Sequence, residues 1–437
     1  MIRSMLFAST VGVLGLTLVG PVQAAASQSG AGAAPAAVDQ ADREAPDPRA
    51  QRRARVRQSL EALKACLDEP SQDCALRSAL LVTAAEDLSI DRSKILLSVA
   101  DSLHAIGDQQ RAERTLGAAK REAQEIGIGF ATDTRFVDVA EIQAKFGEME
   151  AARITASAIG DEILRARAFG RAALALANKG RGADAAEMLG MISVESVAQE
   201  YALQVAEIFS ARAANAEAEK ALETAAVLLE QAPTSRFKRA GEIRLAAARA
   251  RLGQETEARD LRDRMVQDLG RPMTNHARAR LYAEVAALDL ALDDAAAYTD
   301  HLGEARTVLG RVKNAYERDY AVADVAIATA RGGNYDAAIE LAEQIENVDV
   351  RTAFAQRLAR LDSSAEARRV LSTFAHQTSN GGLDSLDQPF TRDEARFALV
   401  TALVDAGSAA PAVDIVDTME DDDAQARGLA YVARLLP

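Results

Sequence analysis

Core-facing residues recur along most of this chain at the spacing of one face of an α-helix, in pairs of short segments separated by tight turns. Residues 319–346 show the pattern most clearly. Before the turn at Gly332 and Gly333 these positions are Val322, Val325, Ala326 and Thr329, and after it they are Ala338, Leu341, Ala342 and Ile345. Spacings of three and four residues place each set on one helical face, so the stretch predicts two antiparallel helices.

The same hairpin recurs from residue 84 onward. A small residue near the start of each second helix aligns the units: Ala112, Ala152, Ala185, Ala218, Ala258, Ala297, Ala338, Ala367 and Ala412. Five residues earlier, six units have a turn glycine: Gly107, Gly147, Gly180, Gly253, Gly333 and Gly407. Twelve residues earlier, an alanine allows close helix contact in all units except two, which have Val285 and Val400. The sixth unit lacks the glycine, and we expect Asp293 and Asp294 to form its corner.

The composition also favours helical hairpins. Hydrophobic residues make up 49% of the 437 residues, but aromatic residues make up only 4%, and there is no Trp. The apolar residues are therefore mostly Ala, Leu and Val. Alanine has the highest helix propensity, so an all-α fold is favoured over sheets.

Residues 333–339, Gly-Asn-Tyr-Asp-Ala-Ala-Ile, resemble the G-x-Y-x-x-A-I turn of tetratricopeptide repeats, whose period is about 34 residues. Ala326 falls where that family has a small residue. The resemblance implies a right-handed α-α superhelical solenoid of about nine TPR-like hairpins. Arrays of this kind need a terminal cap, and residues 421–436 are expected to be a capping helix. The family consists of protein-binding scaffolds.

Two segments interrupt the repeats. Gly127 and Gly129 separate the first two units, and residues 377–389 (QTSNGGLDSLDQP) are polar with adjacent glycines. Clusters of this composition are typical of loops, so we expect a polar loop over 377–389.

Residues 1–24 have the anatomy of a secretory signal peptide, with Arg3 at its start, an uncharged core over 5–19, and small residues after Pro21. The core is short for a membrane span, although an N-terminal membrane anchor is the alternative. No Cys follows it, so no lipid anchor is expected. The prediction is a soluble periplasmic protein without stable membrane insertion after cleavage.

The remainder of the chain divides into a tether and the solenoid. Residues 25–48 are rich in Ala, Gly and Pro and are expected to be disordered, whereas 49–437 form the TPR-like solenoid. The solenoid begins with a basic run: Arg49, Arg52, Arg53, Arg55 and Arg57. We interpret this run as a solvated first helix turn, and a contact for an acidic surface is the alternative.

Cys66 and Cys74 are the two cysteines of the chain, and they lie on either side of Pro70. Proline ends a helix, and Ser71 or Asp73 is suited to cap the next one. The two sulfurs are thus expected across a helix–helix turn. A disulfide is the expected state in an exported protein, and free thiols are the alternative.

Charge and motifs argue against several functions. A formal net charge of −14 disfavours nucleic acid, which needs a basic surface. Ser235 and Lys238 match S-x-x-K but lack the K-T-G and S-x-N partners of that chemistry, so residues 233–235 are interpreted as a helix start. The four histidines are dispersed and are expected at the surface. Residues 420–423 lack the spacing of a calcium loop and are interpreted as a solvated helix cap. We expect no cofactor, no metal and no enzymatic activity.

What remains is a binding surface. In tetratricopeptide arrays the first helices of the hairpins line a concave groove, and the equivalent positions here include Arg167, Glu200, Leu203, Glu207, Tyr320, Ile327 and Arg331. A helix or extended segment of a protein partner suits such a mixed lining, which indicates a periplasmic scaffold or adaptor. The alternatives are that these positions only pack between repeats, that the protein is a structural spacer, or that it is an envelope enzyme resembling superhelical lytic transglycosylases. The enzyme needs a catalytic domain, for which repeats running to residue 437 leave no room.

Overall fold

The computed structural model describes residues 48–437 except 128, 212–214, 232–235, 362–363 and 384–385. The chain divides into two units, Met1–Pro46 and Asp47–Pro437. The predicted signal peptide and nearly all of the predicted tether lie outside the described residues, as does the helix start predicted at 233–235, so these remain predictions.

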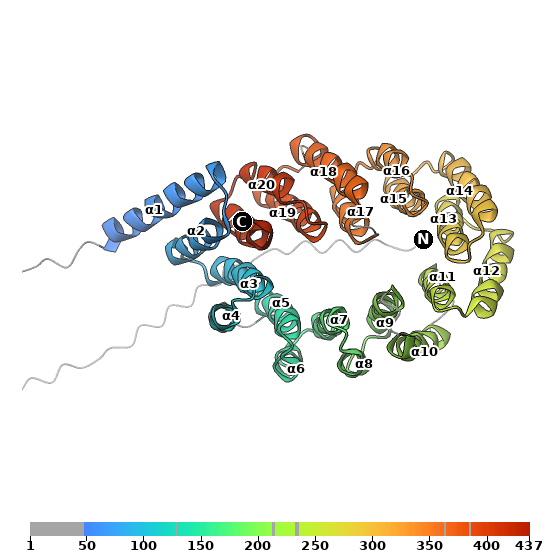
Figure 1. Ribbon diagram of the computed structural model, residues 1–437, viewed down its shortest axis with the longest axis horizontal. Helices are drawn as coiled ribbons and strands as arrows, with labels where there is room; N and C mark the ends of the chain where they lie inside the picture. The colour runs from blue at the N-terminus through green and yellow to red at the C-terminus, as the bar shows by residue number, and fades with distance from the viewer. Residues whose placement is uncertain (1–47, 128, 212–214, 232–235, 362–363, 384–385) are drawn as a thin grey trace, which may run out of the picture. The chain divides into compact units, whose positions relative to one another are not determined.

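The described residues contain 21 α-helices and one 3-10 helix, and no strand (Figure 1). The helices are α1 (Pro48–Asp68), α2 (Gln72–Ala85), α3 (Ser89–Ala105), α4 (Gln109–Glu125), α5 (Phe130–Phe146), α6 (Met149–Ser157), α7 (Glu162–Asn178), α8 (Gly182–Gly190), α9 (Glu195–Ala211), α10 (Asn215–Gln231), α11 (Arg236–Arg251), α12 (Glu255–Leu269), α13 (Asn275–Ala291), α14 (Ala295–Leu309), α15 (Ala315–Arg331), α16 (Tyr335–Ala342), α17 (Val348–Leu361), α18 (Ala365–Asn380), α19 (Pro389–Asp405), α20 (Ala409–Asp417), α21 (Asp422–Val432) and η1 (Ala433–Leu435).

These helices form consecutive hairpins in the order that the repeat predicts. Within the described part of the chain, nine hairpins run from α3–α4 to α19–α20, with α1–α2 before them and α21 after them. Within these nine hairpins the odd-numbered helices lie on the inner side of the array and the even-numbered helices on the outer side (Figure 1). The predicted fold class, an all-α right-handed superhelical solenoid of TPR-like hairpins with a C-terminal capping helix, is confirmed.

A disulfide bond between Cys66 and Cys74 joins α1 to α2. Ser71 caps α2, since its hydroxyl accepts a hydrogen bond from the backbone N–H of Cys74 at 3.4 Å. The basic residues of α1 from Arg52 to Arg57 are exposed, and Arg52 pairs with Asp87. The basic run therefore lies at the surface in the structure.

Seven of the nine hairpins turn at a residue with a positive φ angle, and the turns of the other two include residues that the structure does not describe. Gly333, between α15 and α16, has φ 82°, and the five other predicted turn glycines share this conformation. In the sixth hairpin Asp293 takes this position at φ 56°, and no other non-glycine residue with positive φ occurs in the described chain. Aspartate tolerates the left-handed region because its short polar side chain bonds locally. The expectation that Asp293 helps to form the corner is confirmed.

The position of Asp293 corrects our alignment of the sixth unit by one residue. The turn residue precedes the aligning residue by five positions, so the aligning residue is Tyr298 rather than Ala297. Twelve positions earlier the chain has Ala286, which is fully buried. The close-contact position of this unit is therefore also an alanine, and Val285 does not occupy that position.

A tyrosine fits at this aligning position because the neighbouring turn leaves room for it. The ring of Tyr298 occupies the space that a side chain on Gly332 would need, since an added Cβ would lie 2.0 Å from the tyrosine oxygen. The same hydroxyl donates to the backbone oxygen of Ala328 at 3.2 Å. The α14 helix is thereby bonded to the end of α15.

Replacing Ala338 or Ala152 with leucine is expected to destabilise the protein by about 1–3 kcal/mol, because both alanines are fully buried in a hairpin contact and added methylenes strain a packed core. Asp336→Ala and Glu150→Ala serve as controls in the same two hairpins. Their side chains are exposed, so they are expected to stay within about 0.5 kcal/mol. Urea melts give the ranking, and wild-type stability in both leucine variants would contradict the repeat register.

Successive hairpins are connected by a repeated aspartate contact that our sequence reading missed. An aspartate in the first turns of an odd-numbered helix accepts two backbone N–H groups that lie 27 and 28 residues further along, just before the next odd-numbered helix. The structure shows three instances, with donor–acceptor distances between 2.7 and 3.3 Å. Asp133 accepts from Gly160 and Asp161, Asp319 accepts from Glu346 and Asn347, and Asp393 accepts from Glu420 and Asp421. Each bond pair satisfies donors at a helix start that have no intrahelical partner.

The last helix closes the array onto the first. Helix α21 covers α19 and α20, as a cap is expected to, but it also packs against α2 and α3. The Ser102 hydroxyl on α3 donates to the Ala430 backbone oxygen at 2.5 Å, and the Gln72 N–H donates to the Pro437 oxygen at 3.0 Å. Within the unit Asp47–Pro437 the hairpins thus form a closed series of neighbours.

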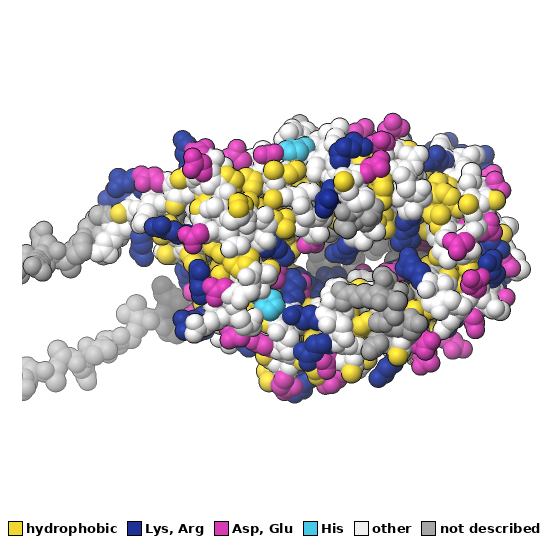
Figure 2. Space-filling view, in the orientation of Figure 1, with side chains coloured by type: hydrophobic (Ala, Val, Ile, Leu, Met, Phe, Trp, Pro, Cys, Tyr) yellow, Lys and Arg dark blue, Asp and Glu magenta, His cyan; other side chains and the backbone are white. Residues whose placement is uncertain are grey.

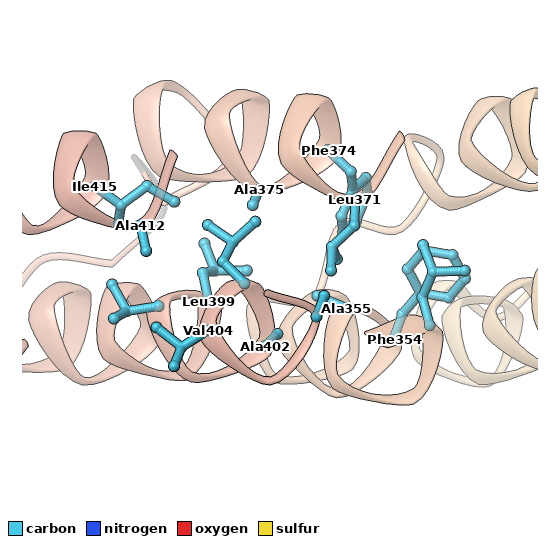
Figure 3. Close-up of a cluster of buried hydrophobic side chains, with 14 of the residues drawn as sticks. Phe354, Ala355, Leu371, Phe374, Ala375, Leu399, Ala402, Val404, Ala412 and Ile415 are labelled. Carbon is cyan, nitrogen blue, oxygen red and sulfur yellow. The ribbon is translucent and has the colours of Figure 1, made fainter. Parts of the chain in front are cut away.

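The apolar core runs between the inner and outer helices. Figure 3 shows the part formed by α17 to α20, where Leu371 and Phe374 of α18 extend toward the helix that carries Phe354. The two rings are fully buried and meet edge to face, with centroids 5.2 Å apart.

The predicted polar loop over 377–389 is wrong in its first part. Helix α18 continues to Asn380 because Thr378 and Ser379 extend its buried face, with 0% and 4% of their surfaces exposed. The described loop residues begin only at Gly381.

Candidate binding surface on the inner helices

The odd-numbered helices pack between their neighbours and leave one polar stripe toward the inside of the array. Side chains on this stripe bond directly from one odd-numbered helix to the next, and charged groups border the central hollow in Figure 2. We call this stripe the inner wall and define it by Asp101, Asp138, Glu141, Lys145, Arg167, Arg171, Glu200, Glu207, Arg244, Arg251, Arg280, Glu284, Tyr320, Asp324, Arg331, Arg357, Glu394, Asp405, Arg427, Tyr431 and Arg434.

Helices α3, α5 and α7 are joined by one network of ion pairs. The Lys145 ammonium lies 3.1 Å from carboxylate oxygens of both Asp101 and Glu141. Arg171 pairs with Asp138 at 2.8 Å and also with Glu141. Burial acts to raise the pKa of Glu141, but the charges of Arg171 and Lys145 outweigh it and lower that pKa to about 2. The Glu141 side chain of the inner wall therefore stays ionised at neutral pH.

A second set of ion pairs comprises two separate groups, one between α9 and α11 and one from α13 to α17. Arg244 donates two hydrogen bonds to Glu207, at 2.9 and 2.8 Å, in the bidentate geometry typical of strong arginine–carboxylate pairs. Asp324 accepts from Arg280 at 2.5 Å and from Arg357 at 2.7 Å. Each of these pairs connects different helices, so the charges hold neighbouring inner helices in register.

A third network spans the closure. Glu394 on α19 accepts from Arg427 on α21 at 2.8 Å and from Lys94 on α3 at 3.3 Å. The Tyr431 hydroxyl donates to Asp405 at 3.3 Å. The ion pairs of the inner wall therefore continue across the junction between the two ends of the array.

Glu284 on α13 differs from the other inner-wall carboxylates because it has no hydrogen bond or ion pair with a described residue. Burial, reinforced by the nearby charge of Asp324, raises its pKa to about 7 although three arginines act against the shift. Its protonation therefore changes near neutral pH.

Glu284→Gln is expected to stabilise the protein more at pH 8 than at pH 5, by on the order of 1–3 kcal/mol. The ordinary carboxyl pKa is 4.5, whereas that of Glu284 in the folded protein is about 7. Between these two pH values the folded state holds a proton that the unfolded state has lost, so the free energy of unfolding of the wild type falls as the pH rises. Glutamine does not titrate, so the variant does not lose this stability. Urea melts at both pH values measure the difference. Glu304→Gln, at an exposed site on α14, is the control, and an equal effect of both variants would contradict the assignment.

The structure separates the predicted groove residues into two groups. Arg167, Glu200, Tyr320 and Arg331 are exposed on the inner wall, and Glu207 is there in its pair with Arg244. Leu203 and Ile327, each only 3% exposed, are buried between helices and offer no surface to a partner. Leu203 packs against Gly241 of α11. Within the first group, Glu207 and Arg331 interact electrostatically, although α9 and α15 are separated by two inner helices.

Several inner-wall residues were not predicted. Among them are Arg244, Arg251, Arg280, Glu284, Asp324 and Arg357. A signal for some of them was present, because positions seven residues apart lie on one face of a helix. Glu200 and Glu207 share such a face on α9, and Arg244 and Arg251 share one on α11. The same spacing leads from Asp324 to Arg331.

Two polar clusters outside the inner wall correct other expectations. His276 and His301 are not simple surface residues: His276 is 9% exposed, and the Nδ1 atom of His301 lies 2.7 Å from the fully buried Asp289. The cap predicted over residues 420–423 is formed by the exposed Asp421, which accepts a hydrogen bond from the Asp423 backbone N–H at 3.0 Å, but the Asp423 side chain is half-buried and not solvated. It lies with Glu86 and Asp91 in a carboxylate cluster, where burial and a hydrogen bond with Glu86 raise its pKa to about 8.

No helix in the described part of the chain combines the length and the apolar character that a membrane crossing needs. No family model matches the chain, and no curated protein matches it.

Solved structures similar to the chain include a signal-transduction ATPase with a tetratricopeptide repeat sensor from Pyrococcus horikoshii, at 12% identity over 74% of this chain (TM-score 0.24). The match spans 61% of the length of that protein. Ton1535 from Thermococcus onnurineus NA1 is similar at 16% identity, over 76% of this chain and 98% of that one (TM-score 0.24). A circular tandem repeat protein with novel repeat topology is similar at 12% identity, over 88% and 96% (TM-score 0.24).

Proposed function

We propose that this protein is an exported, periplasmic scaffold of the tetratricopeptide-repeat type that binds a protein or peptide partner along its inner wall. The observation that carries the proposal is the exposure of polar side chains on helices that are otherwise buried. On α15, every residue from Ala321 to Ala330 is buried, whereas Tyr320 and Arg331, which flank this run, are exposed.

A wall of this kind offers a partner both charge and hydrogen-bonding groups on a rigid support. The ion pairs between neighbouring inner helices keep those groups in place, which lowers the entropy lost on binding. Because α21 closes the array, we expect the partner to reach the wall as an extended segment or a single helix. The Cys66–Cys74 disulfide and the signal-like residues 1–24 support an exported location.

A photo-crosslinking amino acid at Tyr320 tests the proposal in intact cells. Val266 on the outer helix α12 is the matched control, since the two side chains are 38% and 37% exposed. We expect a discrete cross-linked protein from position 320 and none from position 266. No product from position 320, or the same product from both, would favour the structural spacer. Clearing of a peptidoglycan zymogram by the purified protein would favour the enzyme.

The location has a separate test. N-terminal sequencing of the mature protein from a periplasmic fraction is expected to start near Ala25. A chain that begins at Met1 would contradict export.

A further inference from the structure

Three carboxylates meet at the junction where α21 closes the array. Glu86 directly follows α2, Asp91 lies in the first turn of α3, and Asp423 lies in the first turn of α21. Their carboxylate oxygens all lie within 4.8 Å of one another, and all three residues are partly buried. We call these residues the junction cluster. Because α21 packs against α2 and α3, closure of the array brings like charges together from its two ends.

The junction cluster is short of positive charge. Among the described residues, only Lys94 forms an ion pair with one of its members, at 3.8 Å from Asp91. The same ammonium group lies nearer to Glu394 on α19, at 3.3 Å. Glu86 and Asp423 thus have no cation of their own in the described part of the chain. If all three members were ionised, they would repel one another across the junction.

The arginines on the surrounding helices are engaged in other ion pairs. These pairs are Arg92 of α3 with Glu122, Arg427 of α21 with Glu394, and both Arg392 and Arg396 of α19 with Glu420. Asp421, which caps α21, adds a further negative charge at the start of this helix. The elements packed around the junction cluster therefore do not balance its charge.

The Asp423 side chain also lacks hydrogen-bond donors. Its Oδ1 atom is buried and has no hydrogen-bond partner among the described residues. An ionised carboxylate can only accept hydrogen bonds, whereas a protonated carboxyl group can also donate one, here to Glu86. Burial, this hydrogen bond, and the charges of Glu86, Asp421 and Asp91 raise the pKa of Asp423 to about 8.

The usual reason for an acidic residue at a helix start does not account for the junction cluster. The helix dipole favours an anion in the first turn, which applies separately to Asp91 in α3 and to Asp423 in α21. The dipole disfavours an anion at the end of a helix, where Glu86 lies. It therefore does not explain why the three side chains converge. A shared proton does explain it, because it removes one of the charges and supplies the missing donor.

We propose that the junction cluster is a pH-sensitive contact, which holds the array closed while its carboxyl groups share a proton and weakens when that proton is lost. The inference concerns the closure of the array and does not depend on the proposed function.

The direction of the pH effect follows from Asp423. Its pKa is about 8 in the closed array, and in an opened array, where water reaches the side chain, it returns toward the ordinary value of 3.8. Between these two pH values the closed form holds a proton that the open form has lost. Each rise of one pH unit therefore favours the open form by up to about tenfold. Above about pH 8 both forms have lost the proton, and the effect levels off.

Hydrogen exchange of the α21 backbone amides, followed by mass spectrometry, tests this contact. Exchange itself becomes faster with pH, so the wild type is compared with D423N at the same pH and the ratio of the two rates is measured. Asparagine has the shape of the protonated acid and does not titrate. We expect the ratio for α21 to rise by roughly tenfold or more between pH 6 and pH 8. The ratio for α15, an inner helix of the array, is expected to stay constant.

Two further variants make the result specific to the junction cluster. D417N removes the same charge from an exposed site at the end of α20 and is expected to exchange like the wild type at every pH. E86Q removes a neighbouring charge from Asp423 and is expected to show a smaller rise with pH than the wild type. A constant ratio of wild type to D423N, an equal rise for α15, or an unchanged pH dependence in E86Q would overturn the inference.

The last arm distinguishes a proton from a bound cation. The exchange is measured in EDTA and again with added CaCl2, and the same pH dependence is expected in both solutions. Loss of the pH dependence in CaCl2 would overturn the inference, because a calcium ion would then neutralise the junction cluster in place of the proton.

Discussion

A chain that ends at Asp421, and so lacks α21, is expected to lose more than about 4 kcal/mol of stability and to open. Helix α21 packs against α2 and α3 at one end of the array and against α19 and α20 at the other. Its Leu429 and Val432 are fully buried, and burying one such side chain contributes about 1.5–3 kcal/mol. Urea melts measure the loss, and small-angle X-ray scattering is expected to show a larger radius of gyration.

A point variant tests the contact between α21 and α3 in a chain that still contains α21. Ser102→Leu places a larger side chain at the fully buried contact with Ala430 and is expected to cost about 1–3 kcal/mol. Thr307→Leu on the outer helix α14 is the control, because Thr307 is exposed. If the shortened chain keeps the scattering profile and urea midpoint of the full chain, α21 does not hold the array closed.

Phe354→Ala is expected to destabilise the protein by about 3–5 kcal/mol, the usual cost of removing a buried phenyl ring and leaving a cavity. Phe354 is fully buried between α17 and α18, where its ring meets Phe374. Phe374→Ala is expected to cost a similar amount, and the double variant less than the sum. The difference, about 0.5–1.5 kcal/mol, reports the edge-to-face contact.

Phe390→Ala provides a control with the same chemical change. This ring is 56% exposed, and its contact is with Lys94, whose ammonium lies 4.8 Å from the ring centroid. A contact of this kind at an exposed site contributes about 0.5–1 kcal/mol. Equal losses for Phe354→Ala and Phe390→Ala in urea melts would show that the core in Figure 3 is not packed as described.

The helices and their pairing were determined by the sequence itself. Local spacing decides which face of a helix is apolar, and a turn glycine marks where one helix ends and the next begins. Gly333 and the buried Ala338 show both signals within a few residues of each other. The sixth hairpin was misaligned by one residue because Asp293 performs a role that we had assigned to glycine. The Cys66–Cys74 bond was predictable because the two residues are close in sequence and lie across one turn.

The closure, and with it the candidate binding site, was decided only by the tertiary structure. The curvature of a solenoid is the sum of small rotations between successive repeats, and no single residue encodes that sum. It brings α21 against α3, and it brings the charges of Glu207 and Arg331 together from helices far apart in sequence. The same packing buries Leu203 and Ile327, which share the helical spacing of the exposed residues. The sequence therefore determined which residues are helical and which of them repeat, whereas the angle between hairpins determined which of those residues face each other.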